Sequence, residues 1–242
     1  MAIIAIIPSR YSSTRFPGKP LALINGRPMI QHVYERVKTV PNIDKVVVAT
    51  DDKRIADTVE GFGGVAIMTS NEHQCGTDRI AECAKIIGAT DKDIIINVQG
   101  DEPLINKNMV IDLISCFQNK DVYMATLMKR IDAIDELNNP NVVKVVANIK
   151  NEAIYFSRHC IPYERNCSVK HFKHIGIYGY KKWFLDKLSS LERTPLEKAE
   201  SLEQLRVLEY GYTIKVNETI YQTVGVDTPD QLLFVEERMK NE

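Results

Sequence analysis

Three positively charged residues and several hydroxyl residues are crowded into the segment 8–19, directly after an apolar stretch. Arg10 and Arg15 carry planar guanidinium groups that can bind phosphate through paired hydrogen bonds, and Lys19 supplies a mobile point charge. Ser12–Thr14 add hydroxyl groups. The glycine spacing fits neither a Walker A loop nor a GxGxxG dinucleotide loop. A polar surface loop would have a similar composition, but the position after a buried strand favours a loop that binds a polyphosphate.

Two acids that are distant in the sequence each follow an extended run. Asp101 comes directly after Gly100, which allows close backbone approach, and Asp227 precedes Thr228–Pro229. Magnesium commonly takes one or two carboxylates together with substrate phosphates, so these acids and the basic loop form a consistent set. Each acid alone could equally cap a turn, Asp227 at Thr228–Pro229 and Asp101 before Asn106.

Composition excludes several classes of protein. The 242 residues are 44% hydrophobic and 26% charged, with 12 Gly and 10 Pro, which is ordinary for a globular protein and unlike collagen or disordered chains. With 31 Lys and Arg against 32 Asp and Glu, the formal charge is −1. A chain this neutral has no overall attraction to nucleic acid or to an anionic membrane. We therefore expect neither as a partner.

The cysteines and the N-terminal segment bear on location. The five cysteines are odd in number, scattered and without a Cys-x-x-Cys pair, which predicts reduced thiols in a cytoplasmic protein, several of them buried: Cys75, Cys83, Cys116, Cys160 and Cys167. The apolar run 2–7 stops at Pro8, and its nearest positive charge, Arg10, follows it. That order and length do not match a signal peptide or a membrane span, so the run predicts a buried strand.

The first half of the chain alternates between strand and helix patterns. Short runs rich in Val and Ile predict strands buried on both faces at 3–7, 45–50, 65–68 and 93–98. Helical periods lie between them at 28–40, 52–61 and 78–88. This alternation predicts a parallel sheet covered by helices on both faces. Ligands of such sheets bind at the carboxyl ends of the strands, which is where the basic loop and Asp101 lie.

The second half is less regular. It predicts strands at 124–130, 142–148, 153–157, 174–180 and 213–216, and helices from 181 through 187, at 197–210 and at 228–240. The segment 158–172 has no clear period and predicts an excursion from the sheet. No internal repeat or linker is evident. We expect one domain over 1–242 with an inserted lobe roughly at 155–200.

Several motifs in order resemble one enzyme family. They are Arg-Phe-Pro-Gly-Lys-Pro at 15–20, Gly-Thr-Asp-Arg at 76–79, Gln-Gly-Asp-Glu-Pro at 99–103, Leu-Glu-Gln-Leu-Arg at 202–206 and Gly-Val-Asp-Thr-Pro at 225–229, with further matches at 48–51 and 174–180. The chain resembles the 3-deoxy-manno-octulosonate (Kdo) cytidylyltransferases. The resemblance implies a Rossmann-like α/β fold with a mixed, mostly parallel sheet of the glycosyltransferase A-like type and a small dimerisation lobe. It also implies a cytoplasmic, Mg²⁺-dependent homodimer that converts CTP and Kdo to CMP-Kdo and pyrophosphate for lipopolysaccharide biosynthesis.

The resemblance also implies roles for individual residues. Lys19, Arg15, Asp101 and Asp227 are the expected catalytic residues, and the two acids are the expected Mg²⁺ ligands. The expected CTP-binding residues are Pro8, Arg10, Ser13, Arg15, Lys19, Gly76, Arg79 and Asp101. The expected sugar-acid-binding residues are Gln99, Arg158, His174, Tyr178, Glu203 and Gln204. Without the resemblance, Glu203 would suit a solvated helix acid, His174 a core histidine and Tyr178 packing within the lobe.

Three departures from the family pattern concern the substrate more than the reaction. Cys75 stands where a small hydroxyl residue is usual, residues 158–163 differ from the usual sequence around Ile161-Pro162, and 163–173 is compact. One alternative is therefore the same reaction on the 8-amino analogue of Kdo. A cytidylyltransferase for sialic acid or a polyol phosphate fits the motifs at 15–20 and 202–206 less well. A non-catalytic nucleotide-binding relative would not need both Asp101 and Asp227.

Overall fold

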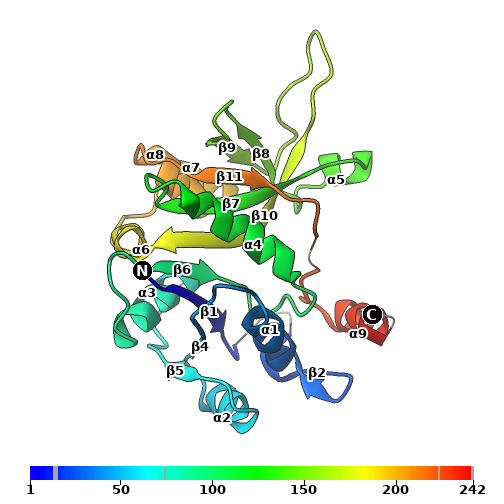
Figure 1. Ribbon diagram of the computed structural model, residues 1–242. Coiled ribbons are helices and arrows are strands. Elements are labelled where there is room, and N and C mark those ends of the chain that lie inside the picture. The colour runs from blue at the N-terminus through cyan, green and yellow to red at the C-terminus, as the bar shows by residue number, and fades with distance from the viewer. Residues whose placement is uncertain (13–15, 74, 223, 241–242) are drawn as a thin grey trace. The chain divides into compact units, whose positions relative to one another are not determined.

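The computed structural model describes residues 1–12, 16–73, 75–222 and 224–240. The chain divides into two units. Unit 1 contains Met1–Ile111, Lys181–Ser189 and Thr223–Glu242, and unit 2 contains Asp112–Tyr180 and Ser190–Gln222. Figure 1 labels the elements of both units. The expected inserted lobe at 155–200 stays a prediction, and residues 181–189 of that range belong to unit 1.

Unit 1 is built on parallel strands in the order β6-β1-β4-β5. Their bounds are β1 (Ile3–Ser9), β4 (Lys45–Thr50), β5 (Ala66–Met68) and β6 (Ile94–Asn97). The central strand β1 pairs on both sides, so that Ile6 lies between Val47 and Asn97. Ile6 and Val47 are fully buried, as expected for strands with helices on both faces. All four strands were predicted from the sequence.

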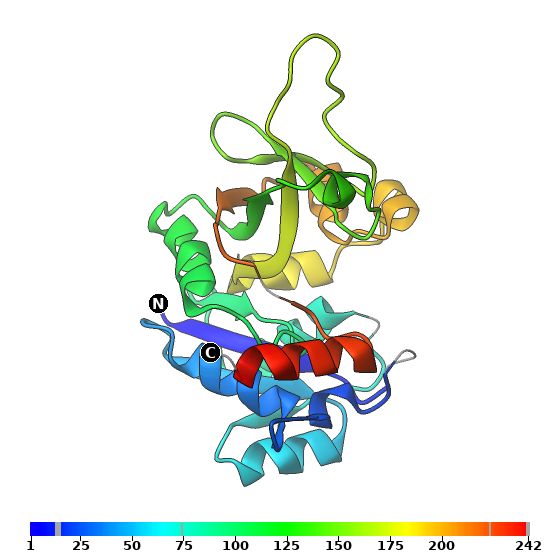
Figure 2. The ribbon, with the colours of Figure 1, turned by 90° about the vertical axis from the view of Figure 1, so that its right-hand side faces the viewer.

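Helices cover both faces of this sheet. In Figures 1 and 2, α1 (Met29–Lys38) and α9 (Pro229–Lys240) lie on one side of the strands, whereas α3 (Gly76–Ile86) and α6 (Lys182–Ser189) lie on the other. A further helix of unit 1 is α2 (Lys53–Gly61). Its N-cap is Asp52, whose carboxylate accepts a hydrogen bond of 2.9 Å from the Arg54 amide. An aspartate at this position satisfies an amide that the helix itself leaves unpaired.

A small hairpin in unit 1 was not predicted. β2 (Leu23–Ile24) and β3 (Arg27–Pro28) pair through Asn25-Gly26, both of which have positive φ. Asn-Gly between two short strands is a strong hairpin signal, so the sequence did contain it. The hairpin contributes Ile24 to a core cluster with Met29 and with residues 104, 226 and 235. The short helix η1 (Lys19–Leu21) precedes it.

Unit 2 has a mixed sheet. β7 (Met124–Arg130) pairs in parallel with β11 (Lys215–Glu218) and antiparallel with β10 (Phe172–Lys181). β10 also pairs with β8 (Lys144–Ala147), which pairs with β9 (Ala153–Ser157). The remaining elements are α4 (Lys107–Ser115), which begins in unit 1, η2 (Cys116–Gln118) and α5 (Ile134–Asn138). The strand predictions for 124–130 and 153–157 are confirmed residue for residue, and the final strand lies two residues later than predicted.

The predicted helix over 197–210 is wrong. Two short helices occupy this region, α7 (Pro195–Glu200) and α8 (Gln204–Glu209). Ser201 between them has φ 52° and ψ 49°, a left-handed conformation that ends α7. The Leu202 amide then donates to the Glu197 carbonyl at 3.2 Å. The apolar period continues across the break, which is why periodicity alone predicted one helix.

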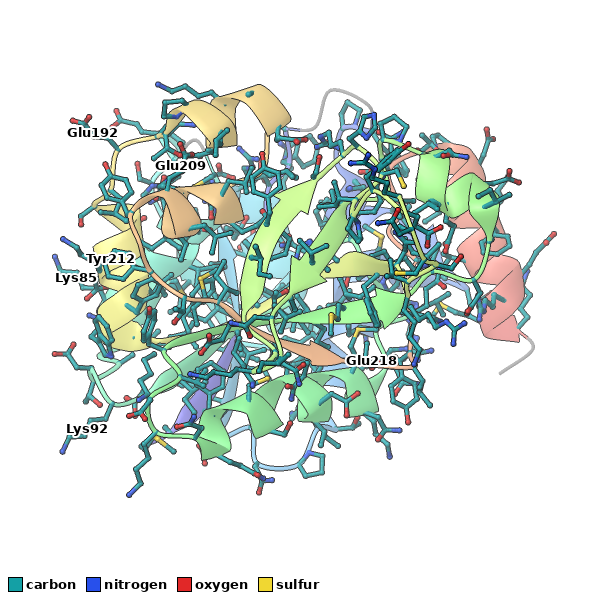
Figure 3. The ribbon with its side chains drawn as sticks, turned by 90° about the horizontal axis from the view of Figure 1, so that it is seen from above. Lys85, Lys92, Glu192, Glu209, Tyr212 and Glu218 are labelled. Atoms are coloured by element: carbon teal, nitrogen blue, oxygen red, sulfur yellow. The ribbon has the colours of Figure 1, made fainter. Side chains whose placement is uncertain are left out.

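Many charged side chains are exposed and some cysteines are buried, as expected from the sequence. Charged residues of both signs are exposed, among them Lys85, Lys92 and Glu218, which Figure 3 labels. Cys83 and Cys116 are buried, and burial raises the pKa of each thiol to about 12. Within the described ranges, no helix is long and apolar enough to cross a membrane.

Candidate active site

The basic loop begins where β1 ends. Ser9 is buried at the last position of the strand, and the chain then turns so that the Gly18 amide donates to the Tyr11 carbonyl at 2.9 Å. Gly18 has φ 70°, a conformation that glycine adopts without strain. The Tyr11 ring is covered by the Arg54 guanidinium, whose central carbon lies 3.3 Å from the ring centroid. These contacts direct Lys19, the next residue after Gly18, toward the sheet.

Lys19 joins the two acids that were singled out from the sequence. Its Nζ lies 2.6 Å from Oδ2 of Asp101 and 3.0 Å from Oδ1 of Asp227. The lysine side chain is 11% exposed, and the two carboxylates are 33% and 40% exposed. The Val226 amide also donates to the Asp101 carbonyl at 2.9 Å, which holds the segment with Asp227 beside the loop after β6. Asp101 and Asp227, which lie 82 and 208 positions after Lys19 in the sequence, thus meet at its ammonium group.

The start of α9 is capped by Thr228 and Gln231. Thr228 and Gln231 form a reciprocal pair: the Gln231 amide donates to the Thr228 hydroxyl at 3.4 Å, and Gln231 Oε1 accepts from the Thr228 amide at 3.1 Å. Gln231 Oε1 also accepts from the Asp227 amide at 2.7 Å. This arrangement is a capping box. The Asp227 carboxylate, one residue before this cap, contacts Lys19 at the pocket.

Two glycines lie close to the end of β1, and one of them, Gly100, is required for the close approach. A Cβ atom added at Gly100 would lie 2.5 Å from Ser9 Oγ and 3.0 Å from the Pro8 carbonyl oxygen, so no other residue fits there without a shift. At Gly76, the first residue of α3, a Cβ would contact the Pro8 ring at 3.6 Å. The helix N-terminus, where amides lack partners, thus lies next to the end of the central strand.

These residues surround a pocket of about 480 Å³ within unit 1. From the expected CTP-binding set the structure places Pro8, Arg10, Lys19, Gly76, Arg79 and Asp101 around it, together with Gln99 and Asp227. Ser13 and Arg15 lie outside the described residues. The pocket is also lined by Ser9, Ser12, Pro20 and Gly100. Ser9 and Pro20 were not singled out as site residues from the sequence, although Ser9 lies in the basic segment 8–19 and Pro20 ends the motif at 15–20.

The donors in this pocket suit a hard divalent cation. Asp101 and Asp227 converge on one positive charge, which is the place where a metal bound by two carboxylates would lie. Among the described residues, no three His, Cys, Asp or Glu side chains are grouped as metal ligands. Two carboxylates with open positions match an ion that shares its coordination with substrate phosphates. The residues therefore fit Mg²⁺ better than a metal held by protein ligands alone.

Unit 2 brings together some of the expected sugar-acid residues. His174 Nε2 lies 3.0 Å from the Thr126 hydroxyl, and its ring lies between those of Phe156 and Tyr178, with centroids 5.1 and 5.3 Å away. Burial lowers the pKa of His174 to about 3, so the ring is neutral near pH 7. Burial, with a smaller contribution from the charge of Glu203, raises the pKa of Tyr178 well above 10. These groups are therefore neutral hydrogen-bonding partners.

Arg158 and Gln204 have different surroundings in unit 2. The Arg158 guanidinium donates to backbone carbonyls, from Nε to Glu200 at 2.7 Å and from Nη1 to Pro140 at 3.0 Å. Gln204 is buried at the start of α8, and its Nε2 has no hydrogen-bond partner among the described residues. Glu203 precedes it at the helix N-cap. Arg158 thus connects strand and helix segments within this unit, and Gln204 retains an unused donor.

Comparisons with known proteins agree on the family. The cytidylyltransferase family matches residues 4–220. A 3-deoxy-manno-octulosonate cytidylyltransferase of Fusobacterium nucleatum is 55% identical over 235 residues, which cover 96% of this chain and 94% of the relative. An enzyme of the same name from Thermodesulfovibrio yellowstonii is 51% identical, with 98% and 97% covered.

Solved structures extend the agreement to the fold. A structure described as CMP:2-keto-3-deoxy-manno-octonic acid synthetase complexed with CTP is 45% identical, covers 100% of this chain and 99% of its own, and has a TM-score of 0.95. A cytidylyltransferase from Leptospira borgpetersenii, at 18% identity with 100% and 88% covered and a TM-score of 0.66, shares the fold alone. The predicted mixed α/β class is confirmed. This chain belongs to the 3-deoxy-manno-octulosonate cytidylyltransferase family.

Proposed function

We propose that this protein transfers a cytidylyl group from CTP to the anomeric hydroxyl of Kdo, giving CMP-Kdo and pyrophosphate. The observation that carries the proposal is the meeting of Lys19, Asp101 and Asp227 at a pocket that Arg10 and Arg79 also line. A basic pocket with two convergent carboxylates suits a nucleoside triphosphate and its cation. The similarity to enzymes that carry this name supports the choice of CTP and Kdo.

In the proposed reaction the anomeric oxygen of Kdo forms a bond to the α-phosphorus of CTP. The bond from that phosphorus to the bridging oxygen breaks, and pyrophosphate leaves with the electron pair. Such transfers depend chiefly on alignment and on neutralising charge. Lys19, Arg10 and Arg15 would hold the phosphate oxygens, and Arg79 and Gly76 would contact the rest of the nucleotide. No residue is assigned as general base.

Asp101 and Asp227 are the residues that would hold Mg²⁺. The ion would neutralise phosphate charge and lower the pKa of a bound hydroxyl. Lys19 contacts both carboxylates, so its ammonium group would lie beside the residues that hold the ion and would add positive charge next to the triphosphate.

For the sugar acid we propose Gln99, Arg158, His174, Tyr178, Glu203 and Gln204. A neutral His174 and Tyr178 suit the hydroxyl groups of a sugar. The spare donor on Gln204 Nε2 suits a hydroxyl or carboxylate oxygen. Glu203 accepts hydrogen bonds from hydroxyls and would also attract the ammonium group of the 8-amino analogue.

We also propose a homodimer in the cytoplasm that serves lipopolysaccharide biosynthesis. Trp183 is 40% exposed next to the fully buried Phe184, which suits an anchor at an interface. The five cysteines, all of them among the described residues, form no disulfide, as in a reducing compartment. Light scattering tests the dimer, because a mass near the 27.5 kDa of one chain at micromolar concentration would contradict it.

Pyrophosphate release tests the reaction. The protein is incubated with CTP, Mg²⁺ and each of Kdo, its 8-amino analogue, a sialic acid and a polyol phosphate. We expect release with Kdo, formation of CMP-Kdo, and loss of turnover in Lys19→Ala. Preference for the amino sugar would change the substrate but not the reaction class. Release with none of the acceptors, although CTP binds, would contradict the proposed function.

A further inference from the structure

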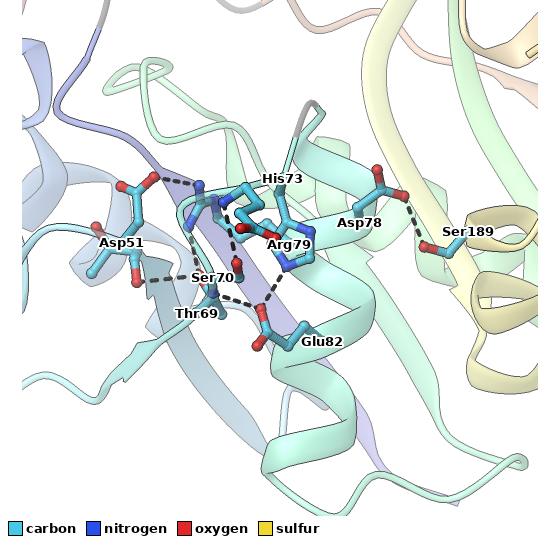
Figure 4. A network of polar contacts seen from close by, with 10 residues as sticks. Asp51, Thr69, Ser70, His73, Asp78, Arg79, Glu82 and Ser189 are labelled. Atoms are coloured by element: carbon cyan, nitrogen blue, oxygen red, sulfur yellow. Dashed lines mark hydrogen bonds and ion pairs between the residues drawn. The ribbon is translucent and has the colours of Figure 1, made fainter.

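Arg79 is the most deeply buried cation of unit 1 among the described residues that line the pocket. It lies in the first turn of α3 and is 0% exposed. Its Nη2 donates to Asp51 Oδ2 at 2.6 Å, and its Nη1 donates to Thr69 Oγ1 at 2.5 Å. Figure 4 shows both contacts. An unpaired guanidinium would be costly at this depth, so these two acceptors allow the charge to stay there.

Both acceptors are fixed by the ends of neighbouring strands. Asp51 directly follows β4 and Thr69 directly follows β5, whose last residues, Thr50 and Met68, are partners in the parallel register. The Thr69 amide and hydroxyl both donate to the Thr50 carbonyl, at 2.8 and 3.2 Å. Thr69 thus fixes the position of the guanidinium relative to the backbone of β4. Two points of attachment set the plane of a planar fork, which one point would not.

This attachment involves both terminal nitrogens of the guanidinium but not the third nitrogen, Nε. Nε is buried and has no hydrogen-bond partner among the described residues, although the arginine lines the pocket. Buried donors are normally satisfied, so Nε would gain a hydrogen bond if a ligand in the adjoining pocket brought an acceptor within reach. Arginine only donates, and the acceptor must therefore be an oxygen or an unprotonated nitrogen of the substrate.

We propose that Asp51 and Thr69 are positioning residues that hold Arg79 in the orientation required to bind the nucleotide. The proposal rests on the proposed function for the identity of the nucleotide as CTP. Arg79 lines the pocket, whereas Asp51 and Thr69 are not among the described residues that line it. They therefore act through Arg79. We expect the loss of either residue to weaken CTP binding and to leave the KM for the sugar acid nearly unchanged.

A purely structural role would give a different result, because another contact tethers the same segment. Glu82 on α3 accepts from the Ser70 amide at 2.8 Å and contacts His73 Nε2 at 2.5 Å. Glu82→Gln weakens this tether without removing an acceptor from Arg79. If Asp51 and Thr69 only fixed the segment after β5, Glu82→Gln would impair nucleotide binding to the same degree. Asp57→Asn, which neutralises an exposed carboxylate on α2, serves as the surface control.

The experiment measures CTP binding by titration calorimetry and then the KM for CTP and for Kdo. We expect Asp51→Asn to raise the Kd and KM for CTP by about tenfold or more, because it removes the negative charge that pairs with the buried guanidinium. Thr69→Val should raise both severalfold, and Thr69→Ser should restore them because it keeps the hydroxyl. The KM for Kdo should change less than about twofold. Glu82→Gln and Asp57→Asn should bind CTP as the unchanged protein does.

Several outcomes would overturn the proposal. These are unchanged CTP binding in Thr69→Val, an equal loss in Glu82→Gln, or failure of Thr69→Ser to restore affinity. If Asp51→Asn does not fold, as judged by circular dichroism, the Thr69 pair decides alone. Failure of the proposed function is seen separately, because an unchanged protein that binds CTP but releases no pyrophosphate with Kdo contradicts the reaction while the titrations still test the positioning.

Discussion

A carboxylate at position 227 could cap α9 or serve the pocket, and its neighbours distinguish these roles. The capping contacts at the start of α9 are made by Thr228 and Gln231, whereas the Asp227 side chain contacts Lys19. Loss of a cap typically costs about 1 kcal/mol of stability, but loss of a metal ligand removes activity. Two variants should therefore have opposite effects.

We expect Asp227→Asn to lower kcat/KM by at least about a hundredfold while the melting temperature changes by only ~2 °C or less, because the amide keeps the shape but binds Mg²⁺ poorly. Gln231→Ala should lower the melting temperature by several degrees and keep kcat/KM within about twofold. Steady-state kinetics at saturating Mg²⁺ and thermal unfolding measure both. If Asp227→Asn keeps nearly the full kcat/KM, Asp227 has a structural role and is not a metal ligand.

Several residues of the site were predictable because they lie in loops that follow parallel strands. The loops with Lys19 and Asp101 follow β1 and β6, which end at one edge of the sheet, whereas Asp227 follows no strand directly and was grouped with them by the chemistry of a magnesium site and by the family resemblance. Ser9 and the acceptors of Arg79 were not predicted, because a serine or threonine at the end of a strand has no distinctive pattern. Asp51 belonged to a family motif, but its contact with Arg79 depends on register between β4 and β5, which one sequence does not reveal.

At the scale of elements, Ser201 shows why a continuous apolar period does not ensure a continuous helix. A non-glycine residue in the left-handed region costs about 1–2 kcal/mol relative to the helical region, and Ser201 has φ 52°. The break is held from both sides by a buried pair, in which Arg206 Nε donates to Glu197 Oε2 at 2.8 Å. Tertiary contacts therefore outweigh the local preference of the segment.

Ser201→Gly tests this account of the break. Glycine adopts positive φ without the steric cost, so we expect a gain in the free energy of unfolding of about 0.5–1 kcal/mol. Lys198→Gly places the same change at an exposed position inside α7, where it should cost about 1 kcal/mol. Urea unfolding measures both. If Ser201→Gly also destabilises the protein, α7 and α8 form a more continuous helix than the structure shows.

At the scale of the whole molecule, the parallel strands of unit 1 could be predicted from the sequence, whereas the division into two units was not among the predictions. The strands of unit 1 are local runs of Val and Ile, so each could be recognised alone. The division into units depends on which distant segments pack together: residues 181–189 join unit 1, whereas 190–222 join unit 2. No periodicity within those segments encodes that choice.

The stability of the folded chain should depend on pH through its buried histidines. His174 has a pKa of about 3 in the folded protein against 6.5 for the ordinary side chain, because of burial. Burial also lowers the pKa of His32. Above pH 6.5 the ring is neutral in both states. As the pH falls below 6.5 the unfolded chain binds protons that the folded chain does not, so stability is lost progressively toward pH 3.

His174→Gln removes one such group, and the difference between the proteins should depend on pH. We expect the free energy of unfolding of the unchanged protein to fall more steeply from pH 7.5 to pH 5 than that of His174→Gln. His159→Gln, at an exposed position, should follow the unchanged protein throughout. Urea unfolding at several pH values gives the slopes. Parallel slopes for all three proteins would show that His174 is protonated equally in the folded and unfolded chains, which would also remove the argument that it meets the sugar acid as a neutral ring.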